Sequence, residues 1–77
     1  MNTYIATFFS HFGAMQYFKA LRNKGITARL MPVPRKISAS CGTCVRYEHD
    51  AAVDLEDCEL DGVYVDADGV FERVISK

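Results

Sequence analysis

The sequence predicts a small α/β domain of the α+β kind. We expect a ferredoxin-like βαββ(α)ββ sandwich, with one main helix packed on a small mixed sheet. Two observations indicate this. A helix with start and stop signals follows the first strand-like segment, and a hairpin turn signal joins the last two strand-like segments. A strand, helix, strand order normally links parallel neighbours by a right-handed crossover. A chain of 77 residues suits one such domain, spanning residues 1–77.

The first two elements are a strand and the main helix. Residues 3–9 are rich in β-branched and aromatic side chains, which is typical of a strand buried on both faces. Ser10 is suited to cap a helix, and Gly25 is suited to end one. Apolar residues recur at helical spacing between them, at Ala14, Phe18 and Leu21. The pattern predicts a helix over residues 11–24.

Two further strands and a short helix are expected next. Residues 26–31 alternate in polarity and predict a strand, which Pro32 ends because proline cannot donate to a strand ladder. Residues 35–42 then form a loop, and residues 44–49 alternate again as a third strand. Asp50 is placed to cap a short acidic helix. That helix would carry Ala52, Val53 and Leu55.

The end of the chain predicts a β-hairpin. Residues 63–65 and 70–75 are both strand-like, and the sequence Asp-Ala-Asp-Gly at 66–69 is a strong turn signal between them. The last strand would either extend the sheet or lie on a partner subunit. The second case would give a homodimer through an edge strand.

The charges divide the chain into a basic part and an acidic part. Nine basic and ten acidic residues give a net charge of -1, which provides no general attraction to nucleic acid or to membranes. Residues 19–46 hold seven cations and no acid, whereas residues 48–68 hold nine acids and no Lys or Arg. We expect the two parts to neutralise each other in the fold. The alternative is that Arg35, Lys36 and Arg46 converge around Cys41.

The expected compartment bears on the cysteines. The first residues lack a signal-peptide pattern, and no apolar run approaches the ~20 residues that span a bilayer. A cytoplasmic protein is therefore expected. In a reducing compartment a C-x-x-C pair is more often catalytic or metal-binding than a structural disulfide.

The C-x-x-C pair, Cys41 and Cys44, is the most informative motif. A cysteine reacts as the thiolate, which nearby cations and free backbone N–H groups favour. Glycine beside a reactive cysteine permits a left-handed backbone that aims N–H groups at the sulfur. The candidate site consists of two thiols with four loop and anion-stabilising residues: Cys41 and Cys44, with Gly42, Arg35, Lys36 and Ser40.

Three alternatives remain open for this motif. A dithiol redox pair normally begins a helix, whereas this pair leads into a strand-like segment. Structural zinc needs four ligands, which Cys58, His49 or His11 could complete, but cations beside the pair disfavour a dication. A metal is therefore not expected, and no cofactor is expected because the sequence has no phosphate-binding glycine motif and no dinucleotide fingerprint. Third, the cysteines are incidental, as expected for a buried Cys58, and the chain is an interaction or regulatory domain.

Several segments together resemble one family of short bacterial proteins, long known only as a domain of unknown function. The similar segments are Tyr4-Ile-Ala-Thr-Phe-Phe-Ser-His, Ala14, Leu21, Gly25-Ile26, Met31-Pro-Val-Pro-Arg and Ser38-Ala-Ser-Cys-Gly. They resemble the selenium/sulfur carrier protein-like family over about the first 48 residues. The resemblance implies a carrier rather than a complete enzyme. It would hold sulfur or selenium on Cys41 as a persulfide or selenopersulfide, received from a cysteine desulfurase or another sulfur/selenium transferase.

The family pattern carries over to the loop only in part. Cys41 with Gly42 matches it, and so does Arg35 after Pro34. Cys44 lies outside the common pattern. The second thiol would either resolve a Cys41 persulfide into a disulfide or be inert.

Overall fold

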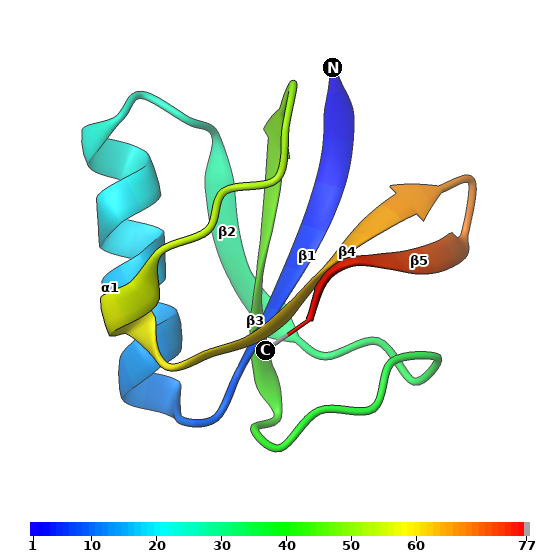
Figure 1. Cartoon of the computed structure of the whole chain (residues 1–77), viewed down its shortest axis with the longest axis horizontal. Helices are drawn as coiled ribbons and strands as arrows, with labels where there is room; N and C mark the ends of the chain where they lie inside the picture. The colour runs from blue at the N-terminus through cyan, green and yellow to red at the C-terminus, as the bar shows by residue number, and fades with distance from the viewer. Residues whose placement is uncertain (77) are drawn as a thin grey trace.

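The computed structural model describes residues 1–76. It contains five strands, one α-helix and one short 3-10 turn: β1 (Asn2–Phe8), α1 (His11–Asn23), β2 (Ala28–Pro32), β3 (Thr43–His49), η1 (Glu56–Cys58), β4 (Leu60–Ala67) and β5 (Val70–Ser76). The strands form one sheet in the order β2-β3-β1-β4-β5. Helix α1 lies along one side of this sheet, and the loop between β2 and β3 lies on the other (Figure 1).

The sheet is antiparallel throughout, so the expected mixed, ferredoxin-like βαββ(α)ββ sandwich is wrong. Every neighbouring pair of strands runs antiparallel. Strand β2 does run in the same direction as β1, but β3 is inserted between them. This order places β1, the most apolar strand, at the centre, and leaves β2, with Arg29 and Pro32, at an edge. Proline is tolerated there because an edge strand need not donate on its outer side. The α+β class itself stands.

The core lies between α1 and the sheet. Strand β1 is buried on both faces from Tyr4 to Phe8, as its composition predicts. Alternate residues of β1 and β3 face the helix and pair across the ladder, Tyr4 with Tyr47 and Ala6 with Val45. These side chains pack against buried residues of α1: Ala14, Tyr17 and Leu21.

Helix α1 begins where the sequence predicts and ends one residue earlier than expected, at Asn23. The Ser10 hydroxyl accepts a hydrogen bond from the Gly13 N–H at 3.1 Å, which caps the first turn. Gly25 adopts a positive φ of 77°, and Ile26 N–H donates to the Leu21 carbonyl behind it. This is the left-handed C-terminal stop that glycine favours.

The expected short helix after Asp50 is wrong. Residues 51–55 are not helical, and only η1 follows them. The backbone of Val53 is held by two buried phenols: its N–H donates to the Tyr47 hydroxyl at 3.0 Å, and its carbonyl accepts from the Tyr17 hydroxyl at 2.6 Å. These bonds satisfy the peptide groups without a helix and let the apolar side chains of the segment pack on the core. The segment also carries closely spaced acids, which would repel one another along a helix.

The final hairpin is confirmed, with a longer first strand than expected. Asp68 and Gly69 both have positive φ, as a tight two-residue hairpin turn requires. The Asp66 carboxylate accepts from the Gly69 N–H at 2.9 Å and closes the turn. Strand β5 pairs with β4 within the same chain, so the last strand extends the sheet.

Candidate functional site

The loop of residues 33–42 crosses the sheet face opposite α1. Its base is closed by Val33 N–H, which donates to the Gly42 carbonyl at 3.0 Å. Its middle is anchored by Ile37, whose side chain is 6% exposed and packs with Ile5 and Cys44. The loop is therefore held against the sheet both at its base and in its middle.

Cys41 lies where this loop returns to the sheet. It precedes β3 by two residues and is half-buried, with a free thiol. Gly42 beside it is exposed, and a Cβ placed there would meet nothing within 4 Å. Gly42 is not among the glycines with positive φ, so the expected left-handed turn at this position is absent. The fold does not require glycine here, and Gly42 leaves open space beside the thiol.

Cys44 is in a different environment, beneath the loop. It pairs with Thr7 of β1 and Met31 of β2, and its side chain is fully buried. Its sulfur donates to the Pro32 carbonyl at 3.6 Å. Burial raises the pKa of the Cys44 thiol to about 11, although Arg46 acts in the opposite direction. Near neutral pH Cys44 is therefore a protonated, covered thiol.

The cations of the basic segment do not gather at one point. The ammonium of Lys36 donates to the Gly69 carbonyl at 3.1 Å, which ties the loop to the β4–β5 turn. The guanidinium of Arg46 contacts the Asp66 carboxylate at 3.4 Å. Arg35 is exposed on the loop, and within residues 1–76 no hydrogen bond or ion pair holds its guanidinium. Of these three cations, Arg35 is the one whose charge is not engaged by another group of the described chain.

Ser40 is exposed next to Cys41 and lines a cleft beside the loop. A cleft of about 400 Å³ lies between the loop and strands β4 and β5. Its lining is polar and includes both loop serines and an ion pair: Ser38, Ala39, Ser40, Asp61, Tyr64 and Arg73. Arg73 contacts the Asp61 carboxylate at 3.4 Å, so its charge is compensated.

The structure adds two residues to the surroundings of the site. His11 at the start of α1 lies 3.3 Å from the Thr43 hydroxyl through its Nδ1 atom. Thr43 is two positions from Cys41, so the end of β1 and the start of β3 bring the imidazole to this end of the sheet. Because the side chains come from segments 32 residues apart, the sequence carries no direct signal of their contact.

The arrangement does not support a zinc site among the described residues. Cys44 faces the loop side of the sheet, whereas Cys58 is buried in the core on the α1 side. Burial, and then the Asp57 carboxylate, raise the pKa of the Cys58 thiol. Residues 1–76 contain no group of three or more histidine, cysteine or acidic side chains placed to hold a metal ion. They also contain no helix long and apolar enough to cross a membrane.

Removal of the Ile37 anchor is expected to expose Cys44. In an Ile37→Ala variant the loop loses most of the side chain that covers the thiol, at a cost of about 2 kcal/mol in folding stability. We expect Cys44 alkylation by iodoacetamide at pH 8.5 to rise at least about tenfold, because local opening becomes more frequent. Peptide mass spectrometry would measure it. The control is Val70→Ala, which shortens an exposed side chain on β5. An unchanged rate of Cys44 alkylation in Ile37→Ala would refute the covering role of Ile37.

One comparison with known proteins gives a match. The family model described as "Putative Se/S carrier protein-like" matches residues 3–67, which is 65 of the 77 residues. The match includes β1 from its second residue, α1, the whole loop with Cys41, and β4. It extends well past the first 48 residues, which hold the segments that resemble the family. Neither a curated protein nor a solved structure matches the chain.

Proposed function

The chain belongs to the selenium/sulfur carrier protein-like family, and from this premise we propose that Cys41 carries the cargo, as a persulfide or selenopersulfide. The observation that supports Cys41 is the contrast among the three thiols. Cys44 and Cys58 are buried, while Cys41 is half-buried in a loop beside an exposed glycine. A carrier thiol must meet a donor and then an acceptor, so it has to be reachable from outside the fold.

Loading would proceed by attack of the Cys41 thiolate on the outer sulfur of a donor persulfide. The donor's sulfur–sulfur bond breaks, and its electron pair leaves with the donor cysteine as a thiolate. Cys41 then holds the transferred sulfur as a persulfide. Delivery repeats the exchange, because an acceptor nucleophile takes the outer sulfur and the Cys41 thiolate is released. The same steps apply to selenium. Each is a nucleophilic displacement that needs no oxidant and no cofactor.

The donor would be a cysteine desulfurase or a related sulfur/selenium transferase. Gly42 would let the donor's active-site loop approach Cys41, since no side chain stands beside the thiol. Arg35 would steer an acidic donor and stabilise the anionic adduct, because its charge is unengaged within residues 1–76. Lys36 would act indirectly, by fastening the loop to the β4–β5 turn. Ser40 would offer a hydroxyl donor next to Cys41.

Incubation with a desulfurase and cysteine, followed by intact mass spectrometry, tests the proposal. The wild-type chain is expected to gain the mass of one sulfur atom, and Cys41→Ser to gain none. Cys44→Ser is the matched control and should load like wild type, since its hydroxyl can still donate to the Pro32 carbonyl. An adduct on Cys41→Ser, or none on wild type with a desulfurase that loads another acceptor, would overturn carriage on Cys41.

A further inference from the structure

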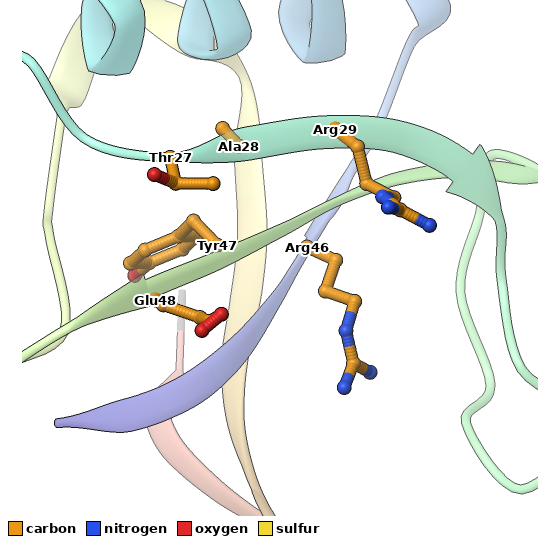
Figure 2. A pocket seen from close by; sticks show the side chains of 6 residues that line it. All are labelled: Thr27, Ala28, Arg29, Arg46, Tyr47 and Glu48. Atoms are coloured by element: carbon orange, nitrogen blue, oxygen red, sulfur yellow. The ribbon is translucent and has the colours of Figure 1, made fainter.

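Two arginines lie on neighbouring strands at the edge of the sheet. Arg29 of β2 and Arg46 of β3 are direct partners in the antiparallel register. Figure 2 shows both side chains extending from the sheet away from α1. Like charges directly opposite each other on neighbouring strands destabilise a sheet. The pair therefore opposes folding unless something negative lies against it.

The chain supplies that negative charge only in part. Arg46 contacts the Asp66 carboxylate at 3.4 Å. For Arg29, no hydrogen bond or ion pair to the guanidinium exists within residues 1–76. The acids of residues 54–59 do not reach this face, because η1 and its neighbours pack on the α1 side. The expected mutual neutralisation of the basic and acidic segments is thus incomplete at Arg29.

The surface at this arginine pair is hollow. A depression of about 380 Å³ is lined by Thr27 and by residues of both strands: Ala28, Arg29, Arg46, Tyr47 and Glu48. The space is large enough for a small anion or a small phosphorylated molecule. Glu48 lies two positions beyond Arg46 on β3, and its side chain points to the same side of the sheet (Figure 2). An anion would therefore sit at the arginine end, and a hydroxyl or amine could reach the Glu48 carboxylate.

We propose that the Arg29–Arg46 depression binds a phosphate group, either free or as a phosphomonoester. Guanidinium groups bind tetrahedral oxyanions through paired N–H donors, and two arginines at paired positions of neighbouring strands can both contribute to one such site. Bound phosphate would also relieve the repulsion between the arginines. The inference does not depend on sulfur carriage by Cys41, because Arg29, Arg46 and the lining residues all lie outside the loop.

Nitrogen-15 NMR titration at constant ionic strength tests the site. With inorganic phosphate we expect saturable changes in the amide chemical shifts of residues 27–29 and 46–48. The Arg29→Gln variant should bind phosphate at least about tenfold more weakly, which corresponds to one lost charge-assisted contact. Lys19→Gln, an exposed charge removal on α1, should bind like wild type, and so should Cys41→Ser. Absence of saturation in wild type, or equal binding by Arg29→Gln, would overturn the site.

A second titration distinguishes the two sources of the phosphate group. Glycerol 3-phosphate is expected to bind more tightly than inorganic phosphate if a hydroxyl reaches Glu48, and Glu48→Gln should reduce that advantage. Equal affinities would assign the site to free phosphate. Binding of neither ligand would refute the proposal.

Thermal unfolding gives an independent readout. In low-salt buffer without phosphate, Arg29→Gln should unfold at a higher temperature than wild type, since one of two opposed charges is removed. Added phosphate should raise the wild-type midpoint and leave the variant unchanged. A lower midpoint for Arg29→Gln in phosphate-free buffer would contradict the repulsion on which the inference rests.

Discussion

A persulfide on Cys41 is expected to persist at neutral pH despite the neighbouring Cys44. Resolution would require the Cys44 thiolate to attack Cys41 sulfur, form a disulfide and expel sulfide. With the pKa of Cys44 raised to about 11 by burial, only about one thiol in ten thousand is ionised at pH 7. The Cys44 sulfur is also covered by the loop, and its S–H donates a hydrogen bond to the Pro32 carbonyl. Both features suppress the reaction that would end single-thiol carriage.

The same reasoning gives a pH dependence. Below the folded pKa of about 11, the thiolate fraction of Cys44 rises about tenfold for each pH unit. Sulfide release from loaded wild-type protein should therefore accelerate from pH 7 to pH 9.5. The loaded Cys44→Ala variant should release sulfide only at the background rate. Sulfide can be followed colorimetrically after removal of the donor. Rapid release at pH 7 that Cys44→Ala abolishes would show that Cys44 resolves the adduct.

A methyl group at Gly13 is expected to destabilise the whole domain. A Cβ at this position would clash with the backbone carbonyl oxygen of Cys58, in the turn that packs on the first turn of α1. A backbone atom cannot swing away as a side-chain end can, so η1 or the helix must move. The cost of such overpacking is about 1–3 kcal/mol, and it outweighs the helix propensity that alanine gains over glycine. The melting midpoint of Gly13→Ala should fall by about 5–15 °C.

Gly42→Ala is the matched control for this prediction. The same methyl group at residue 42 meets nothing within 4 Å, and the backbone there is not left-handed. Its free energy of unfolding should stay within about 0.5 kcal/mol of that of wild type. If Gly42→Ala nevertheless slows sulfur loading, the glycine serves the approach of the donor. A Gly13→Ala chain as stable as wild type would show that η1 is not held firmly against the helix.

The three cysteines differ in burial, and their spacing in the sequence does not reveal this difference. Cys41 and Cys44 form one C-x-x-C motif, but the loop leaves the first half-buried and covers the second. A dithiol redox role would need the second thiol to ionise and attack the mixed disulfide formed on the first. The covered, protonated Cys44 does not favour that role. The arrangement favours one working thiol and one structural thiol.

Local features of the chain were predictable from the sequence alone. The first strand, the capped helix from Ser10 to Gly25 and the final hairpin depend on neighbouring residues: a hydroxyl cap, a glycine stop and an Asp-Gly turn. The segments between Tyr4 and Gly42 that resemble the family are also local, and the family model, which matches residues 3–67, confirms the family. Such features are encoded within a few positions of one another, so no knowledge of the rest of the fold is needed.

Only the tertiary structure decided which segments meet. The insertion of β3 between β1 and β2 depends on long-range pairing of apolar strands, and the side-chain period is the same in any strand order. The extended segment around Val53 replaced an expected helix because Tyr17 and Tyr47, distant in sequence, bind its peptide groups. The covering of Cys44 by Ile37 and the opposition of Arg29 to Arg46 have the same origin. Contacts between distant residues depend on the global packing, which local sequence patterns do not specify.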